Sequence, residues 1–251
     1  MKRHSSFHKE KPILIKGIHA IEEAIGSGKS LEKIFIQKGD RNEKISSLIK
    51  TANQNEIPLQ YVPVEKLNKL GAAHQGVAAV VSPVSFFKTE DIIAQAYERG
   101  EDPLLIICDG ITDVRNFGAI ARTAYAAAAH ALIIPQTETA SINSEAVKAS
   151  AGALMNIPVC REKNLNLTVK NLRLNGIQIL AAMASGSKFI FDCDLKIPIA
   201  IILGSEGKGI SNELLKHADE IVKLPMANAF NSYNVSVAAG MILYEVMKQR
   251  M

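Results

Sequence analysis

The stretch IAIILGSEGKGI, residues 199–210, indicates the fold class of this chain. Its first five residues are apolar and largely β-branched. Such a run is too short for a core helix but typical of a strand that is buried on both faces. Helical segments separate this run from others like it, which are Leu104–Cys108, Ala131–Pro135, Ile177–Met183 and Glu220–Leu224. The pattern predicts an α/β fold with a parallel sheet and crossover helices.

A second, smaller α/β pattern precedes this one. Amphipathic helices are predicted over residues 17–25, ending at Gly26, and over residues 43–53. Short β-like runs complete the unit: Lys33–Gln37, Leu59–Val62 and Gly76–Ser82. The unit has roughly seventy residues, near the lower limit for a domain that folds alone. We therefore expect a basic tail at 1–11, a small domain at 12–83, a linker and first helix (Thr89–Arg99) at 84–102, and the larger domain at 103–251.

The composition narrows the class of protein. The chain has 251 residues, of which 47% are hydrophobic and 22% charged, and this excludes a disordered or collagen-like protein. Its formal charge of +4 is too small to indicate a nucleic-acid partner by itself. Residues 1–82 contain 13 basic and 8 acidic residues, however, whereas the remainder contains 16 and 17. The positive first third fits a module that contacts phosphates, or an ordinary solvated basic surface.

Cysteines and histidines give no sign of a metal site. Cys108, Cys160 and Cys193 form no CxxC pair and lie in or beside apolar runs, so we expect small buried side chains in a reducing compartment. The six histidines include no HxxxH or HExxH spacing. The first dozen residues lack the apolar stretch of a signal peptide, and no run reaches the length of a membrane span. We expect a cytoplasmic protein.

Ligands of open parallel sheets bind outside the carboxyl ends of the strands, and three segments there have unusual compositions. In the first, residues 109–124, Asn116 and Arg122 are six positions apart. If the helix begins near Phe117, Arg122 lies on its second turn. Asn116 can also be only a helix cap and Arg122 only a solvated charge.

The other two segments follow the runs that end at Leu203 and Leu224. Residues 204–209 contain three glycines, which allow a backbone to approach a ligand closely but also suit a tight turn. The phosphate-loop and dinucleotide fingerprints are both absent. Residues 224–240 place several amide and hydroxyl side chains before a helix that extends to about Gln249. Asn234 or Ser236 can cap that helix, and the surplus predicts a polar pocket wall.

These segments together resemble the SpoU/TrmH branch of the SPOUT methyltransferases, which transfer methyl from S-adenosylmethionine to a ribose 2′-hydroxyl in RNA. The matching motifs are Asn116-x-Gly118-x-x-x-Arg122-Thr123-Ala124, Leu203-Gly204-Ser205-Glu206-Gly207-x-Gly209, and Pro225-Met226 followed by Ser232-x-Asn234-Val235-Ser236. The likeness covers about residues 104–250. The small domain, with Gly17-Ile18-His19-Ala20 and His74-Gln75-Gly76-Val77, is similar to the ribosomal-protein-like RNA-binding domain of the RlmB-type members.

The resemblance implies a role for individual residues. The positions that match the family's catalytic and substrate-site residues are Asn116, Arg122, Glu206, Ser232 and Asn234. The positions that match or adjoin its cofactor contacts are Leu203, Gly204, Gly207, Gly209, Leu224, Met226, Tyr233 and Val235. It further implies a trefoil knot, a homodimer, and a guanosine of large-subunit ribosomal RNA as the substrate.

The chemistry suggests how these residues act. Asn116, Ser232 and Asn234 offer hydrogen bonds without charge, which suits positioning, and Glu206 can anchor Arg122 or its own loop. The family role proposed for Arg122 is general base. A guanidinium that binds the adjacent phosphate and stabilises the developing alkoxide accounts equally well for this arginine.

The sequence departs from the family pattern at several positions. Val114-Arg115 replaces the usual Pro-His, and Ala128-Ala129-His130 replaces a turn that contains glycine. Asn228 stands where glycine is usual and Tyr233 where leucine is usual. The last two changes flank the cofactor loop, so they bear on cofactor affinity more than on the chemistry.

Three alternatives remain open. A transfer-RNA methyltransferase of the same type is disfavoured by the separate small domain, which those members usually lack. A non-catalytic RNA-binding or ribosome-assembly factor is disfavoured by the complete set of catalytic-type residues. A nicotinamide-dependent dehydrogenase lacks its glycine fingerprint.

Overall fold

A computed structural model describes residues 12–39, 42–228 and 231–251 of the chain. The chain divides into two compact units, one up to Pro83 and one from Val84 onward. The basic tail predicted at residues 1–11 lies outside the described residues. Within the described ranges, no helix combines the length and the apolar character that a membrane crossing requires.

The first unit is a four-stranded mixed sheet with helices on both faces. The strand order is β1 (Leu14–Lys16), β4 (Val77–Val81), β2 (Leu31–Gln37) and β3 (Leu59–Val62). Only the β2–β3 pair is parallel. Helices α1 (Ile18–Gly26) and α2 (Glu43–Gln54) contribute to the hydrophobic cluster on one face, and α3 (Val64–Leu70) contributes Leu67 to the cluster on the other.

The predicted elements of this unit are confirmed to within two residues at each boundary. The sequence analysis missed β1 and α3. All three residues of β1 are half-buried, so the strand has no clear alternation, and α3 buries one side chain, Leu67. Elements this short contain too few positions for their periodicity to stand out.

The second unit contains an eight-stranded sheet in which every strand pair is parallel, as the apolar runs predict. Its order is β10 (Lys188–Phe189), β12 (Glu220–Lys223), β9 (Gln178–Ala182), β11 (Ile199–Gly204), β6 (Leu104–Asp109), β7 (Ala131–Pro135), β8 (Val159–Glu162) and β5 (Phe86–Phe87).

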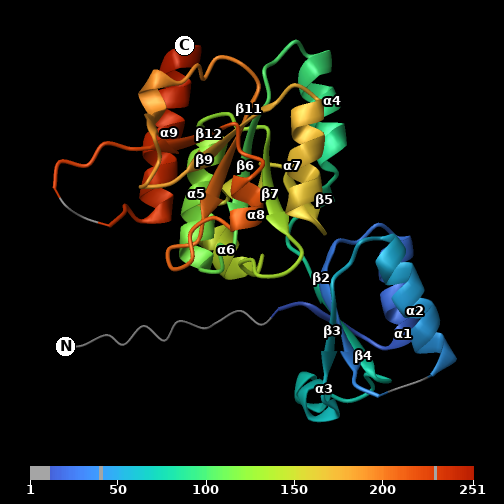
Figure 1. Cartoon of the computed structure of the whole chain (residues 1–251). Helices are drawn as coiled ribbons and strands as arrows, with labels where there is room; N and C mark the ends of the chain where they lie inside the picture. Colours follow the sequence, from blue (N-terminus) through green and yellow to red (C-terminus); the bar gives the residue numbers. More distant parts are fainter. Residues whose placement is uncertain (1–11, 40–41, 229–230) are drawn as a thin grey trace, which may run out of the picture. The chain divides into compact units, whose positions relative to one another are not determined.

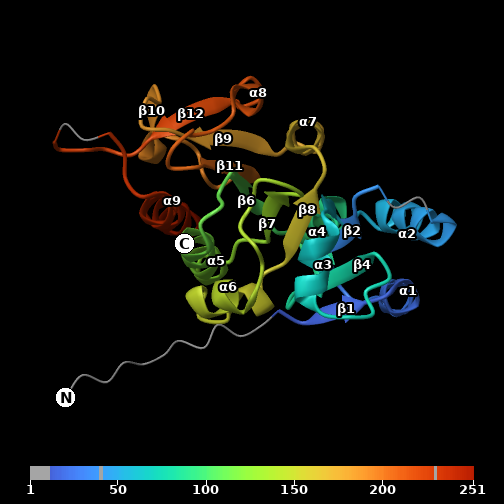
Figure 2. The same cartoon turned by 90° about the horizontal axis from the view of Figure 1, so that it is seen from below.

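Helices cover both faces of this sheet, as Figures 1 and 2 show. The helices on one face are α5 (Val114–Ala126), α6 (Ser144–Ala149) and α9 (Val235–Arg250). Those on the other face are α4 (Thr89–Glu98), α7 (Leu165–Leu174) and α8 (Asn212–Leu215). The central strands supply both cores: Leu104 and Ile106 of β6 face the first set, whereas Leu105 and Ile107 face the second. A strand buried on both faces needs apolar side chains at every position, and this explains the continuous runs.

Two expectations need correction. The expected linker contains β5, which pairs with β8, and β8 itself was missed because only two of its four residues are buried. Helix α5 begins at Val114 rather than near Phe117. The Asp113 carboxylate accepts hydrogen bonds from the backbone N–H groups of Arg115 and Asn116 at 2.9 and 2.8 Å and so caps α5. Arg122 therefore lies one turn further into the helix than expected.

Candidate functional site

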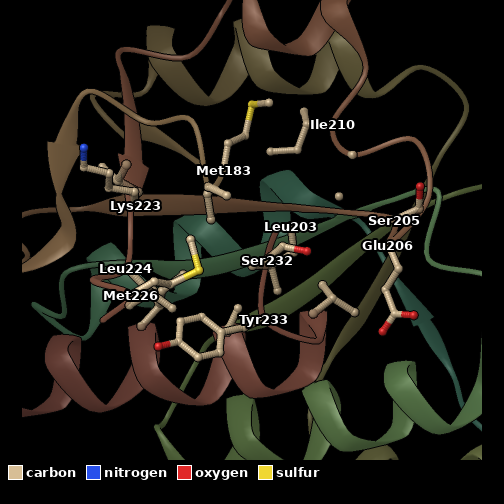
Figure 3. Close-up of a pocket in the computed structure, with 18 residues that line it drawn as sticks. Met183, Leu203, Ser205, Glu206, Ile210, Lys223, Leu224, Met226, Ser232 and Tyr233 are labelled. Carbon is tan, nitrogen blue, oxygen red and sulfur yellow. The ribbon is translucent and has the colours of Figure 1, made fainter. Parts of the chain in front are cut away.

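A pocket lies at the carboxyl ends of strands β9, β11 and β12, where the loops that leave them meet the start of α9 (Figure 3). Most of its wall is apolar. The apolar side chains of the wall are Ala182, Met183, Ala184, Leu203, Ile210, Val222, Leu224, Met226, Val235, Ala238 and Ile242. Polar lining comes from Ser205, Glu206, Lys223, Ser232 and Tyr233. In Figure 3, Ser205 and Glu206 lie at one end and Leu224 and Met226 at the other.

The structure brings most of the predicted cofactor residues to this pocket. All eight line it except Gly207. The end of β9, represented by Met183, was not singled out by the sequence analysis. The rule that ligands bind at carboxyl strand ends would have identified it, because the apolar run at Ile177–Met183 was already predicted to be a strand.

The glycine-rich segment is a tight turn that also lines the pocket. The backbone N–H groups of Ser205 and Gly209 donate to each other's carbonyl oxygens, at 3.2 and 2.9 Å. A Cβ at Gly204 would stand 2.3 Å from the carbonyl carbon of Gly209, so no larger residue fits there. Gly209 has a φ of +69°, which favours glycine. Of the two interpretations that the sequence left open, the tight turn is therefore confirmed, and the ligand loop stays a prediction for a segment that lines the pocket.

Three of the five predicted catalytic residues form a connected polar trio. The side-chain amide of Asn116 donates to Oε1 of Glu206 at 3.1 Å, across 90 positions of sequence. The Asn234 amide donates to Oδ1 of Asn116 at 3.1 Å and also to Oε1 of Glu206. Glu206 lines the pocket, so the trio places two amides directly behind a pocket carboxylate.

Asn234 has a second task at the start of α9. Its Oδ1 accepts hydrogen bonds from the backbone N–H of Ser236 at 2.9 Å and from the Ser236 hydroxyl at 2.6 Å. The amide orientation is therefore fixed from both ends, because its oxygen caps the helix while its nitrogen faces Glu206. Ser236 was considered as an alternative cap and as part of the third motif, and the structure places it as the group that holds Asn234.

The other two predicted catalytic residues lie outside the trio. Ser232 lines the pocket. Arg122 is exposed on α5, and Glu206 bonds to the two amides rather than to it. Among the described residues, no hydrogen bond or ion pair reaches the Arg122 guanidinium.

For two further side chains near the pocket, the structure defines the hydrogen bond of one and the protonation of the other. The Tyr233 hydroxyl donates to the carbonyl oxygen of Pro225 at 2.9 Å and links two pocket segments that leucine could not link. Burial raises the pKa of the Cys108 thiol to about 12, so this group near the end of β6 stays protonated at neutral pH. A thiolate nucleophile at this position is therefore disfavoured.

In the first unit, the two quoted sequence motifs meet. The backbone N–H of Ile18 donates to the Gln75 side chain at 3.2 Å, and a Cβ on Gly17 would stand 3.2 Å from the same oxygen. Gln75 itself has a φ of +49°. Non-glycine residues in this region are uncommon and are often found at binding surfaces. The motifs at residues 17–20 and 74–77 are thus in direct contact with each other.

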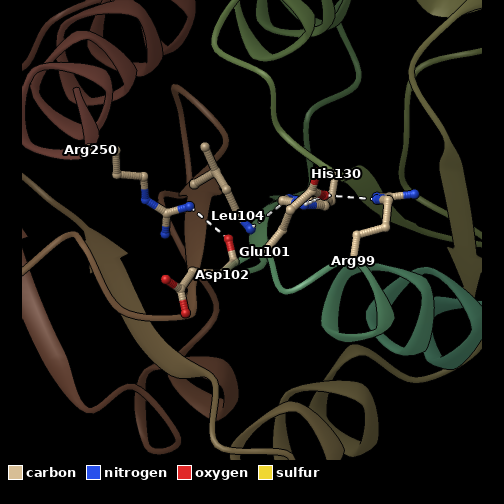
Figure 4. Close-up of polar contacts among 6 residues, drawn as sticks. All are labelled: Arg99, Glu101, Asp102, Leu104, His130 and Arg250. Carbon is tan, nitrogen blue, oxygen red and sulfur yellow. Dashed lines mark hydrogen bonds and ion pairs between the residues drawn. The ribbon is translucent and has the colours of Figure 1, made fainter.

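The amino edge of the large sheet carries a different polar arrangement (Figure 4). The Arg250 guanidinium donates to the carbonyl oxygens of Leu195, Asp102 and Ile197 at 2.8, 2.7 and 2.7 Å. Nδ1 of His130 accepts the backbone N–H of Leu104 at 3.0 Å, and its Nε2 lies 3.1 Å from Glu101. These side chains satisfy backbone groups at the edge where the strands begin.

Family models and known proteins match most of this chain. The family model described as the SpoU rRNA Methylase family matches residues 103–244. A second, described as RNA 2′-O ribose methyltransferase substrate binding, matches residues 14–87. A protein of Staphylococcus haemolyticus assigned to the TrmH family of tRNA/rRNA methyltransferases is 36% identical over 239 residues, 95% of this chain and 96% of its own.

Solved structures give the same result. The SpoU methyltransferase AviRb from Streptomyces viridochromogenes, in complex with the cofactor AdoMet, is 26% identical with a TM-score of 0.61, over 95% of this chain and 90% of its own. The TrmH/SpoU tRNA modifying enzyme of A. aeolicus is 29% identical with a TM-score of 0.54. That likeness covers 83% of its own chain but 64% of this one.

Proposed function

This chain belongs to the SpoU rRNA methylase family and is an S-adenosylmethionine-dependent RNA 2′-O-ribose methyltransferase, and we propose that its substrate is a guanosine of large-subunit ribosomal RNA. The observation that carries the choice of RNA is the first unit, which matches a substrate-binding model over residues 14–87. The likeness to the A. aeolicus tRNA modifying enzyme covers much less of this chain. The proposed division is an RNA-binding domain at 12–83, a connecting segment at 84–102 and a catalytic domain at 103–251.

The residues at the pocket fit S-adenosylmethionine. The apolar wall around Leu203, Leu224 and Val235 suits an adenine ring, and the Glu206 carboxylate at the polar end suits a cationic group. When bound, this cofactor supplies a methyl group on a positively charged sulfur. Gly204 and Gly209 keep the turn beside the pocket free of side chains, and Tyr233 fixes the segment that ends at Met226 through its bond to Pro225.

The polar trio positions the reacting ribose. Methyl transfer needs an aligned nucleophile, and alignment supplies roughly 7–11 kcal/mol of a reaction barrier. Asn116 and Asn234 hold each other and Glu206, so the groups that meet the 2′-hydroxyl are ordered before the RNA arrives. Ser232, on the pocket wall, adds a hydroxyl that can donate to or accept from the ribose.

Arg122 is the proposed partner of the charge that develops on the 2′-oxygen. Its guanidinium is exposed and is not committed to any described side chain, so it can meet an RNA phosphate and the nascent alkoxide. A guanidinium rarely loses its proton in proteins, and this favours charge stabilisation over general-base catalysis.

The proposed homodimer uses the outer face of α9. Val237 and Tyr244 are 50% and 68% exposed there, and Met241 and Met247 extend the same stripe, while the opposite face of the helix is buried. An apolar stripe at three- and four-residue spacing on a long helix suits a matching stripe on a second copy. Replacement of Tyr244 by Glu is expected to give monomers in sedimentation analysis. The knotted path of the third motif under the second remains a prediction.

The deciding experiment measures methyl incorporation from labelled S-adenosylmethionine into undermethylated large-subunit ribosomal RNA and into bulk transfer RNA, followed by mapping of the 2′-O-methyl sites. Label at one guanosine of the ribosomal RNA is the expected result. Labelled transfer RNA would show that the substrate is transfer RNA instead of ribosomal RNA. RNA binding without any methylation of either RNA contradicts the proposed substrate and favours an assembly factor or a pre-ribosomal substrate.

A further inference from the structure

Helix α5 carries two positive side chains on one exposed stripe. Arg115 and Arg122 are its only charged residues, and both are exposed. They are seven positions apart, which returns them to the same side of an α-helix with about 10 Å of rise between them. Phe117, Ile120 and Ala124 are buried on the opposite side, whereas Gly118 is buried nearer the stripe, against Ala149. Ala119, between the two arginines, leaves the stripe without a bulky side chain.

The position of Arg115 fixes where this stripe begins. Its neighbour in the chain is Asn116, whose amide bonds to Glu206 at the pocket. Adjacent Cα atoms are 3.8 Å apart, so the Arg115 backbone lies directly beside the polar trio. A side chain of this length and charge at that point can reach an RNA strand whose ribose is held by the trio.

Local interactions in the protein do not explain Arg115. Within the described part of the chain, its guanidinium has no hydrogen bond or ion pair, and the nearby Asp113 carboxylate is used to cap the backbone N–H groups of α5. The first turn of α5 contains no acidic residue. A positive side chain in the first turn is opposed by the helix dipole, whereas a bound anion there is favoured.

From these observations we propose that Arg115 is a second RNA contact of the catalytic domain, which binds the phosphodiester next to the one that meets Arg122. The two arginines then form a short phosphate track along α5, with the target ribose at the Asn116 end. This inference rests on the proposed RNA methyltransferase function. It assigns different requirements to the two positions: charge alone suffices at Arg115, whereas Arg122 needs its planar guanidinium.

The test measures the salt dependence of binding to an in vitro transcript of large-subunit ribosomal RNA. Loss of one phosphate contact lowers the slope of log affinity against log salt by roughly 0.7 for a single strand. Arg115→Ala should show this decrease and a severalfold rise in the KM for RNA with kcat retained, and Arg115→Lys should keep the slope. Lys170→Ala on α7, exposed on the other face of the sheet, is the matched control and should leave the slope unchanged.

Stability and cofactor measurements separate this role from a structural one. Arg115→Ala should unfold at a temperature at least as high as the wild type and bind S-adenosylmethionine with unchanged affinity. An equal slope for Arg115→Ala and the wild type overturns the inference, as does a fall in kcat without a change in RNA affinity. If the wild type methylates no RNA, the proposed function fails; if it methylates normally and only the slope test fails, the phosphate track alone is wrong.

Discussion

At the amino edge of the large sheet, Arg250 donates to three backbone carbonyls and His130 accepts a backbone N–H. At the carboxyl edge, Asn116, Glu206 and Asn234 bond to one another, and Asn234 also caps α9. The first arrangement satisfies backbone groups that the strand ends leave unpaired, and therefore stabilises the fold. The second holds polar side chains in place around a pocket while part of their hydrogen-bonding capacity faces solvent. We therefore propose that the sheet separates stability, at its amino edge, from function, at its carboxyl edge.

The largest expected effect comes from Asn234, which belongs to the polar trio and also caps α9. In Asn234→Asp the carboxylate can still cap α9, but the donor that faced Glu206 becomes a like charge. We expect kcat/KM to fall about 100-fold, the scale of losing one positioned donor at an active site, with a small change in unfolding free energy.

Asn234→Ala provides the comparison for that variant. It removes both the cap and the donor, so activity should fall by a similar factor and the free energy of unfolding by a further 1 kcal/mol or so, about the value of a helix cap. Urea unfolding monitored by circular dichroism measures the difference. Wild-type turnover by Asn234→Asp would show that the trio has no part in catalysis.

The next largest effect is a loss of stability that we expect when Arg250 is replaced at the amino edge. Arg250→Lys leaves a charge but cannot serve three carbonyls with one rigid fork, so we expect a loss of about 2 kcal/mol in unfolding free energy. Once folded, this variant should keep its kcat, because the residue lies at the edge away from the pocket. Lys248→Ala is the control, because the one described partner of its exposed side chain is Glu245 on the same helix, and it should change stability by less than about 0.5 kcal/mol. An unchanged stability for Arg250→Lys, or a fall in its kcat alone, would contradict the separation of the two edges.

This separation also explains what the sequence could predict. The buried runs at β6 and β11 were recognised because strands covered on both faces are apolar at every position. The loops that follow them were recognised because ligands bind at carboxyl strand ends. The pairing of Asn116 with Asn234, 118 positions apart, depends on strand order and crossover paths, which periodicity does not encode. The three carbonyls held by Arg250 were unpredictable for the same reason.

Boundaries were predicted less well than elements. The sequence analysis took Phe117 as a possible start of α5, whereas the Asp113 side chain begins the helix earlier by capping it. The edge strand β5 was assigned to a linker because two residues carry no period. In both cases a local hydrogen-bonding partner decided the structure, and hydrophobic pattern alone does not reveal that partner.

A smaller effect is expected at the turn between α5 and β7. Ala128 has a φ of +54°, in the region that favours glycine. Ala128→Gly should raise the free energy of unfolding by about 1 kcal/mol, because it relieves this backbone conformation. Ala126→Gly, at the exposed last residue of α5, should have the opposite sign, since glycine weakens helices by roughly 0.5–1 kcal/mol. Thermal unfolding of both variants checks the signs, and a destabilised Ala128→Gly would contradict the prediction.

The smallest expected effect is a change in stability with pH that Glu101 causes at the amino edge. Hydrogen bonds from Arg99 and then from His130 hold the pKa of Glu101 below its ordinary value of 4.5. A carboxyl group with a lowered pKa in the folded state stabilises the protein fully above that ordinary value, and loses this contribution as pH falls through the lowered pKa. The wild type should therefore unfold at a higher temperature than Glu101→Gln at pH 7, and the difference should shrink below about pH 4.5. The exposed Glu98→Gln serves as the control. A difference between the wild type and Glu101→Gln that stays constant down to pH 3 would show that the charge on Glu101 does not stabilise this edge.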